Sequence, residues 1–407
     1  MRHDCCYEII DIFDLEAYNK SMKKILFILF MICGLFFNIP ARAQSGNIDT
    51  AILLSMMYIT NNVQENGRFV YRNSTDENIR YSSKYYSSLR HAGTLYSMYL
   101  CEKELKYNSL KRKRILASDY FLKNYVQKLS NDKYVVVSKP VEEAPFLLAT
   151  SGGAGLGLMA LSNLYPEKLI DIEVLKGLGN FIIFMQAENG DFWASYDIKN
   201  KTYSNAHYAR YYPGEAALGL LYLYDVNPDK KWLNASKKTL LRLAKKAEKK
   251  QPSEIKFDHW AMLASKKLYE NPNNGLTQEE KSAIQEFVQK NVNAILPKQN
   301  MSLLSLNYGS FNGTRTLCGN ATIMEGLIAA YDVVSDASLK TKIAKSAAAG
   351  TSFLMKYQVQ SGKMEGGIPG TSNWKSKNSQ KSDKEIRIDN VQHSLSAFIN
   401  YKKITQN

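Results

Sequence analysis

Six apolar segments alternate with six charged, amphipathic segments along this 407-residue chain. Several apolar segments carry small or hydrophobic residues on nearly every side, so a helix formed by them must be buried all round. The intervening segments have a one-sided apolar stripe that recurs every three or four positions, as at Leu339, Ile343 and Ala347. The compact arrangement of such a chain is a ring of helical hairpins with the apolar helices around the axis. The sequence therefore predicts an all-α (α/α)6 toroid of alternating outer and inner helices, with little β structure.

The predicted helices can be placed along the chain. The outer helices run near 49–64, 110–127, 168–186, 229–248, 278–294 and 337–357, and the inner helices begin near His91, Gly152, Gly214, Asp258, Gly319 and Asn390. Pro228 suits a first helical position, and Thr277 with Glu280 is typical of a capping box. We expect a small hairpin at 134–138 and a mobile polar loop at 369–385. Because no Pro/Ser-rich linker interrupts residues 44–407, they are predicted to form a single toroid domain.

The N-terminal region has the pattern of an export signal. Lys23 and Lys24 precede an apolar stretch at 25–39 and the small-x-small site Ala41-Arg42-Ala43. We expect residues 22–43 to be a cleaved signal peptide and 1–21 to be an over-extended start, with native upstream sequence as the alternative. The mature protein is then predicted to be periplasmic or secreted.

Charge and hydropathy limit the classes of partner that the chain can be expected to bind. The net charge of +15 could attract nucleic acid, acidic membranes or acidic polysaccharide, although a solvated outer face is its commonest explanation. Export disfavours nucleic acid, and no run outside the signal approaches the ~20 apolar residues that span a bilayer. The expected partner is a glycan or small carbohydrate, neutral or acidic, with no membrane contact after cleavage. The oligomeric state is left open.

Two cysteines, Cys101 and Cys318, lie outside the leader. Two thiols in an oxidising compartment suggest one disulfide, and two buried, unpaired thiols are the alternative. If the first and last hairpins meet as the ring closes, the two residues could come close enough to bond.

Four histidines remain after the leader, and each lies at or just before the start of a predicted inner helix. In such a ring these helix starts collect at one mouth, where unsatisfied backbone N–H groups point inward. Carboxylates, aromatic rings and arginines gather in the same segments, although Asp258 could be an N-cap and Arg90 could pair with Asp389. The candidate catalytic residues are His207, Tyr211, Glu215, Asp258 and His259. The candidate substrate-binding residues are Arg90, His91, Arg210, Tyr212, Trp260, Arg315 and His393.

Three predicted outer helices end in one signature, a glutamine followed by a glycine turn and a large apolar residue. The copies are Gln64 to Phe69, Gln186 to Trp193 and Gln358 to Met364. The signature resembles the Q-x-x-x-G-x-W/F repeat of the terpenoid-cyclase and prenyltransferase toroids, and is similar to helix-turn patterns of six-hairpin glycosidases, sugar 2-epimerases and toroidal polysaccharide lyases. The chain has no Asp-x-Asp-Asp motif and no Asp/Cys/His zinc set, so terpenoid and prenyl chemistry are disfavoured.

These observations predict an exported glycan-active enzyme with its active site at the inner-helix mouth. Hydrolysis would use Glu215 with Asp258, and elimination of a uronide would use His207 or Tyr211 with Arg210. Epimerisation could use two histidines, as the resemblance to sugar 2-epimerases implies. A non-catalytic glycan- or peptide-binding toroid is the alternative. No cofactor is predicted, since phosphate-binding glycine motifs are absent, and no metal is predicted, since no two histidines share helical spacing.

Overall fold

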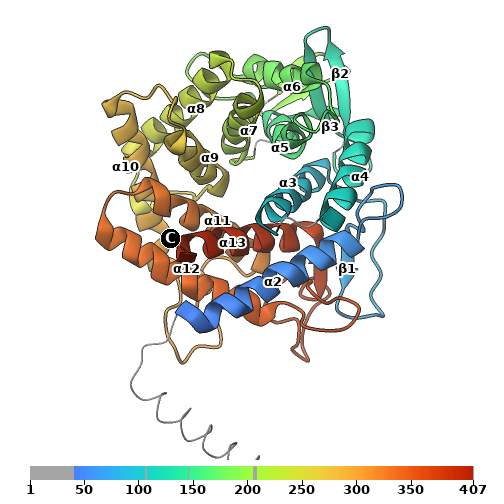
Figure 1. The fold of residues 1–407 in the computed structure, drawn as a ribbon, viewed down its shortest axis with the longest axis vertical. Helices are drawn as coiled ribbons and strands as arrows, with labels where there is room; N and C mark the ends of the chain where they lie inside the picture. The colour runs from blue at the N-terminus through green and yellow to red at the C-terminus, as the bar shows by residue number, and fades with distance from the viewer. Residues whose placement is uncertain (1–40, 106–107, 145, 205–208, 407) are drawn as a thin grey trace, which may run out of the picture. The chain divides into compact units, whose positions relative to one another are not determined.

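Six inner helices form a closed ring in the computed structural model, which describes residues 41–406 apart from 106–107, 145 and 205–208 (Figure 1). Each inner helix packs on the next in chain order, and the last returns to pack on the first. The inner helices are α3 (Ser88–Leu105), α5 (Ser151–Leu161), α7 (Tyr212–Val226), α9 (His259–Glu270), α11 (Leu317–Val333) and α13 (Ile388–Gln406). The predicted hub of six helices is confirmed.

Outer helices alternate with the inner ones along the chain. They are α2 (Ala41–Asn61), α4 (Asn108–Tyr125), α6 (Ile172–Met185), α8 (Lys230–Glu248), α10 (Gln278–Ile295) and α12 (Ala337–Tyr357). Each of α4, α6, α8 and α12 packs on the inner helix that precedes it in the chain. The fold is therefore the predicted (α/α)6 toroid. Residues Asn47–Asn407 form one unit by their contacts, separate from residues 1–46, and the predicted extended start and nearly all of the signal peptide lie outside the described residues.

Local sequence signals set where helices begin. Thr277 and Glu280 form the expected capping box at the start of α10. Asp229 caps α8 by accepting a hydrogen bond from the backbone N–H of Lys231, so Pro228 lies before the helix rather than at its first position. Three short 3₁₀ helices, η1 (Ser162–Leu164), η2 (Pro252–Glu254) and η3 (Leu296–Lys298), complete the helical structure of the described residues.

The repeated glutamine–glycine signature fastens the outer helix that it follows to the next outer helix. The side-chain amide of Gln186, after α6, donates to the backbone of Ala235 and the hydroxyl of Thr239 on α8, at 2.9 and 2.7 Å. Gln358, after α12, donates in the same way to Ala51 and Ser55 on α2, which closes the outer layer.

The glycine of the signature has a positive φ and abuts a backbone carbonyl of the next outer helix. Gly67 abuts Leu116 and Gly190 abuts Lys238, so no side chain fits at either position. In the last copy Gly366, not the expected Gly362, makes this contact. Gln299, after α10, also bonds to the next outer helix, at Ser346. The sequence pattern missed this fourth copy because its glycine, Gly309, lies ten residues further on.

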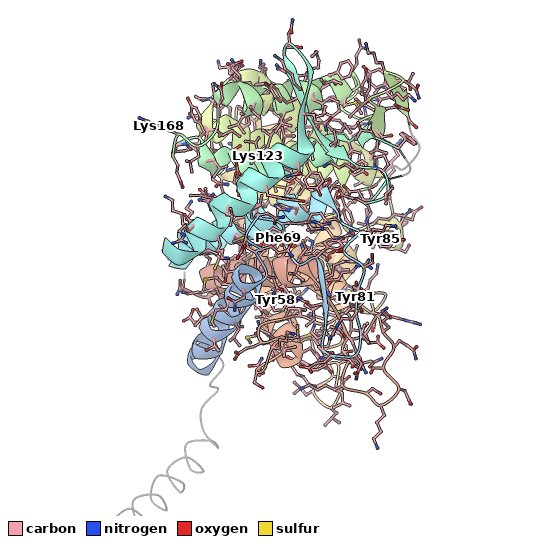
Figure 2. All side chains as sticks on the ribbon, turned by 90° about the vertical axis from the view of Figure 1, so that its right-hand side faces the viewer. Tyr58, Phe69, Tyr81, Tyr85, Lys123 and Lys168 are labelled. Carbon is pink, nitrogen blue, oxygen red and sulfur yellow. The ribbon has the colours of Figure 1, made fainter. Side chains whose placement is uncertain are left out.

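Short strands lie between the helices. β2 (Val126–Ser130) and β3 (Lys133–Ser138) form the expected hairpin, which extends into a five-stranded antiparallel sheet with β4 (Leu148–Ala149), β5 (Ser195–Asp197) and β6 (Thr202–Ser204). β1 (Arg72–Ser74) pairs with β7 (Glu385–Arg387). The segment between β1 and α3 carries Tyr81 and Tyr85, and the Tyr81 hydroxyl donates to the carbonyl of Lys381 (Figure 2).

The suggested disulfide between Cys101 and Cys318 is not formed in the structure, so this suggestion is corrected. Cys101 lies thirteen residues into α3, whereas Cys318 is the second residue of α11. At ~1.5 Å of rise per residue, the two lie toward opposite ends of the hub, far beyond the ~7 Å between Cα atoms that a disulfide tolerates. Moreover α13 lies between α3 and α11 in the ring. None of the described helices is both long and apolar enough to cross a membrane.

Glycines set the closest contact in the hub, between α5 and α7. A Cβ added to Gly155 would overlap the backbone of Glu215, and one added to Gly219 would overlap Gly155. We predict that Gly155→Ala lowers the free energy of unfolding by about 1–3 kcal/mol, because two backbones must separate. Chemical denaturation measures it. Gly153→Ala on the same helix is the matched control, since an added Cβ there would lie 3.0 Å from a side-chain atom, the Thr150 hydroxyl, and would meet no backbone closer than 3.7 Å. Equal stability of the two variants would show that α5 and α7 are not packed this closely.

Candidate functional site

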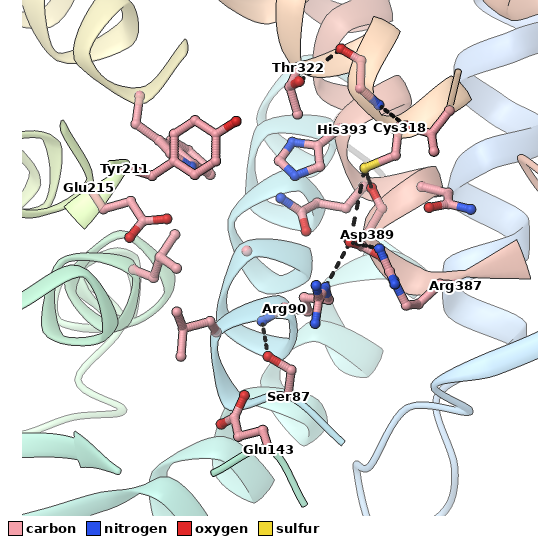
Figure 3. A pocket seen from close by; sticks show the side chains of 18 of the residues that line it. Ser87, Arg90, Glu143, Tyr211, Glu215, Cys318, Thr322, Arg387, Asp389 and His393 are labelled. Carbon is pink, nitrogen blue, oxygen red and sulfur yellow. Dashed lines mark hydrogen bonds and ion pairs between the residues drawn. The ribbon is translucent and has the colours of Figure 1, made fainter. Parts of the chain in front are cut away.

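The first turns of the inner helices surround a pocket of about 700 Å³ at one mouth of the hub (Figure 3). α3, α7, α9, α11 and α13 all contribute residues to its lining. Segments outside the hub complete the wall: residues between β3 and β4, and the segment between α12 and α13 that was expected to be a mobile loop. The latter is held by hydrogen bonds such as that from the Thr371 hydroxyl to Asp383, 2.7 Å. The volume is typical of small-molecule sites, which span ~300–1,000 Å³.

A carboxyl group next to the pocket is shared by two imidazoles that line it. Oε2 of Glu325 on α11 is 2.8 Å from Nδ1 of His393 on α13 and 3.7 Å from Nε2 of His259 at the start of α9. The two ring centroids are 5.3 Å apart, and all three residues are buried. A neutral His393 that donates from Nδ1 to the carboxyl group leaves Nε2 as an acceptor, which is the state required of a base.

His259 is the more deeply buried of the two imidazoles in this cluster. Burial, followed by the charge of His393, lowers the pKa of His259 well below its ordinary value. Within the described residues, neither Nε2 of His259 nor Oε1 of Glu325 has a hydrogen-bond partner. Buried polar atoms of this kind are ordinarily satisfied, and they are common where a ligand completes the site.

Glu215 lies on the opposite side of the pocket from Asp389 and Arg387 (Figure 3). It belongs to the first turn of α7, and its Oε2 has no hydrogen-bond partner among the described residues. Burial, together with the charge of Asp258, raises the pKa of Glu215 to about 8. A carboxyl group in this state keeps its proton at neutral pH and can act as a general acid. Gly152 leaves the room for it, since a Cβ there would overlap Oε2.

Asp258 serves as the N-cap of α9. Its Oδ1 accepts hydrogen bonds from the backbone N–H groups of Trp260 and Ala261, at 3.0 and 3.2 Å. Burial raises the pKa of Asp258 to about 7 despite these two bonds. The residue does not line the pocket, so the structure gives it the helix-capping position that was the alternative to catalysis.

Aromatic rings form part of the wall and floor. Trp260 is buried, with its ring 4.6 Å from His259 and 5.9 Å from His393 between centroids. Tyr211 meets His259 edge to face at 5.3 Å. Tyr212 also lines the pocket, and burial with the charge of Glu215 raises its pKa to about 12. Flat apolar faces beside polar groups suit the two-faced surface of a sugar ring.

Two arginines at the pocket edge are both engaged by one carboxylate. Arg90 Nε donates to Asp389 Oδ2 at 2.8 Å, and Arg387 donates through Nε and Nη2, at 2.5 and 2.9 Å. Burial alone would raise the pKa of Asp389, but the two guanidinium charges outweigh it and hold the pKa at about 2. The expected alternative, in which Arg90 pairs with Asp389 and joins the first hairpin to the last, is confirmed.

Several sequence candidates lie elsewhere. His91 is fully buried against α4, with Nε2 2.9 Å from the carbonyl of Ala117 and Nδ1 2.7 Å from the Tyr86 hydroxyl. Burial lowers the pKa of His91 to about 3, so it is a core residue. Arg210 stacks on Tyr211, Arg315 is exposed, and neither lines the pocket. His207 lies outside the described residues.

Sequence reasoning did not select three residues that line the pocket or adjoin its lining: Glu143, Gln392 and Glu325. Glu325 lies within an apolar inner helix, where a carboxyl group requires a buried partner, and this was the signal that could have identified it. Glu143 accepts hydrogen bonds from the backbone and hydroxyl of Ser88, at 2.9 and 2.5 Å. Gln392 packs against Gly93, where a Cβ would overlap its amide. Glu143 follows a strand rather than opening an inner helix, so the helix pattern gave no signal for it.

The same cluster is the one metal-binding candidate among the described residues. His259, Glu325 and His393 each offer one donor atom, all within 4.8 Å of one another. Two imidazoles and a carboxylate suit Zn²⁺ or Fe²⁺, and the helical-spacing rule missed them because they come from three helices. An ion with ~2 Å bonds holds tetrahedral ligands ~3.3 Å apart. The 2.8 Å between Glu325 and His393 is instead a hydrogen-bond distance, so we treat the cluster as an acid–base group.

The raised pKa of Glu215 predicts a pH-dependent stability. Below pH 4.5 the residue is protonated in both the folded and the unfolded chain, so folding is not opposed. As pH rises toward about 8 the unfolded chain ionises first, and stability is lost. We predict that Glu215→Gln melts at a higher temperature than the wild type at pH 8 and at nearly the same temperature at pH 4.5. Calorimetry measures it, with Glu286→Gln on the exposed face of α10 as control. A pH-independent difference would show that Glu215 is ionised when folded.

No protein-family model matches the sequence, and no curated protein is detectably similar in sequence. Solved structures do match. A D-mannose isomerase superposes with a TM-score of 0.64 at 12% identity, covering 90% of this chain and 100% of its own. Cellobiose 2-epimerase from Bacillus thermoamylovorans B4167 gives 0.60 at 16% identity, covering 84% and 95%.

Glycosidases share the fold as well. The α-1,6-mannanase GH76A of Salegentibacter sp. HEL1_6 superposes with a TM-score of 0.57 at 11% identity, covering 87% of this chain and 98% of its own. All three neighbours are carbohydrate-active enzymes of the (α/α)6 toroid superfamily. At these identities the likeness establishes the fold.

Proposed function

We propose that this protein is a carbohydrate-active enzyme that moves a proton at a carbon atom of a reducing sugar, as an epimerase or isomerase does. The observation that carries the proposal is the hydrogen bond between Glu325 and His393 at the wall of the pocket. A base oriented by a buried carboxyl group and a protonated acid, Glu215, border the same cavity. The isomerase and the epimerase among the structural neighbours act on sugars by name, which supports the substrate class.

The chemistry follows from the positions of these groups. Nε2 of His393 removes a proton from the carbon next to the carbonyl of an open-chain sugar, and the bonding pair moves onto the carbonyl. Glu215 gives its proton to the carbonyl oxygen, and the product is an enediol. Return of a solvent proton to the same carbon on the other face gives the epimer, and return of the His393 proton to the neighbouring carbon gives the isomer. On either route a hydroxyl proton of the enediol passes back to Glu215 as the carbonyl re-forms. His259, whose ring adjoins that of His393, has a pKa well below its ordinary value and therefore holds no extra proton for either return.

Hydrolysis is the second candidate, and the raised pKa of Glu215 favours it. A glycosidase requires a second carboxylate across the sugar. Asp258 is occupied as a helix cap, so Glu143, which lines the pocket, is the better partner. An inactive variant of the mannanase has two consecutive aspartates replaced by asparagine, and this chain contains no two consecutive aspartates. A hydrolase here would therefore use a different pair.

Elimination of a uronide is less well supported by the site. That reaction requires a cation to neutralise the uronate. Both arginines that line the pocket, Arg90 and Arg387, are engaged by Asp389. Arg210, the earlier candidate, lies outside the lining.

We predict that residues 44–407 convert a reducing mono- or disaccharide, such as mannose or cellobiose, into its epimer or ketose. The product is followed by NMR, with reducing-end release from α-1,6-mannan and cellulose as the parallel assay for hydrolysis. Loss of an acid–base group costs ~10²–10⁴ in rate, so His393→Asn and Glu325→Gln should lower kcat at least about a hundredfold. Glu286→Gln, exposed on α10, is the matched carboxamide control.

The outcomes separate the candidates. Sugar conversion that persists in His393→Asn would show that His393 is not the base. Reducing-end release without conversion would establish the hydrolase, with Glu215 and Glu143 as the next variants. Binding of sugar without either reaction would identify a recognition module.

A further inference from the structure

Leucines at a loop tip are the most exposed large hydrophobic residues among those described. Between η3 and α11, Leu303 is 82%, Leu304 99% and Leu306 79% exposed, and Met301 is 45% exposed. A single exposed leucine is ordinary on a protein surface. Four apolar residues within six positions instead form a patch of the kind that marks an interaction surface.

The loop holds its shape through its own hydrogen bonds. The backbone N–H of Asn300 donates to Ser310 at 2.7 Å, and that of Gly309 donates back to Asn300 at 2.8 Å. The side-chain amide of Asn300 donates to the Ser305 hydroxyl at 2.8 Å, and Lys356 Nζ donates to the carbonyl of Leu306 at 2.7 Å. The loop that carries the leucines is therefore already ordered. Binding through these leucines then costs less conformational entropy than binding through a loose segment would.

The surroundings of the loop are cationic. Residues 287–324 contain two lysines, one arginine and no acidic residue. Residues 337–364, which include all of α12, contain five lysines and no acidic residue. The two segments adjoin, because Gly309 abuts Ala349 of α12 and Gln299 donates to Ser346. Among the α12 lysines, Lys342, Lys345 and Lys356 are exposed.

We propose that the loop Met301–Leu306 is a docking tip for an anionic lipid surface. Its leucines enter the boundary between headgroups and acyl chains while the α12 lysines contact the anionic headgroups. An apolar tip beside basic residues is the arrangement by which interfacial proteins bind such membranes. The charge argues for lipid over a second copy of the chain, since two copies would bring the same lysines together. This inference is independent of the proposed reaction.

The proposal departs from the sequence expectation of no membrane contact. That expectation rested on the absence of a further run of ~20 apolar residues. A tip of four apolar residues is far shorter than such a run, and only its exposure in the fold distinguishes it from a core segment.

The test is co-sedimentation of residues 44–407 with vesicles. Vesicles of phosphatidylcholine alone are compared with vesicles that also contain phosphatidylglycerol, at low and high salt. We expect binding to the anionic vesicles that weakens with salt. The variant Leu303→Ser/Leu304→Ser/Leu306→Ser should lose about tenfold or more in partitioning, because its apolar surface is gone. Lys342→Gln/Lys345→Gln, which leaves the Lys356 hydrogen bond to the loop in place, should bind the anionic vesicles more weakly.

Two variants control for the loss of exposed leucine or lysine side chains elsewhere on the surface. Leu169→Ser removes a partly exposed leucine between η1 and α6, and Lys245→Gln/Lys249→Gln/Lys250→Gln removes three exposed lysines at the end of α8 and just beyond it. Both should bind as the wild type does, and circular dichroism should show unchanged folding. Equal binding by the triple-leucine variant would overturn the proposal. Self-association without vesicles that the triple-leucine variant abolishes would also overturn it, in favour of a second copy.

Discussion

Closure of the ring of inner helices is the constraint on which the pocket and its functional groups depend. The last inner helix, α13, packs on the first, α3, although they lie some three hundred residues apart in sequence. Asp389 fastens this seam at the mouth by accepting hydrogen bonds from Arg90 on α3 and from Arg387. On the outer layer, Gln358 fastens α12 to α2. A buried carboxylate that lost one arginine would be left partly uncompensated, which is costly in a low-dielectric interior.

Closure places the first turns of the inner helices around one cavity. The acid–base cluster takes one group from each of α9, α11 and α13, while Glu215 is supplied by α7. The glycine contact between α5 and α7 draws the hub together and leaves room for the Glu215 carboxyl group. The same packing that stabilises the fold therefore dehydrates Glu215 and raises its pKa.

Much of the fold was predictable from the sequence, because it rests on signals that are local. Apolar periodicity marked all twelve helices, and the Thr277–Glu280 box marked a helix start. The site was predictable only in part, because helical phase and partners from other helices decide it. His91 and His393 both lie within the first turns of inner helices, yet His91 faces α4 and His393 faces Glu325. Asp258 and Glu215 carry the same chemistry, but only Asp258 finds backbone N–H donors. No pattern in the sequence links Glu325 to a histidine 68 positions away.

We propose that His393, oriented by Glu325, exchanges a proton with a sugar carbon. Incubation in D₂O with mannose or cellobiose, followed by NMR of the recovered sugar, tests this directly. The account predicts that the wild type replaces the hydrogen at the carbon next to the carbonyl with deuterium, and that Glu325→Gln slows this exchange at least about a hundredfold. Sugar conversion without deuterium at the carbon that receives the returning proton, or exchange that is equally fast in Glu325→Gln, would contradict it.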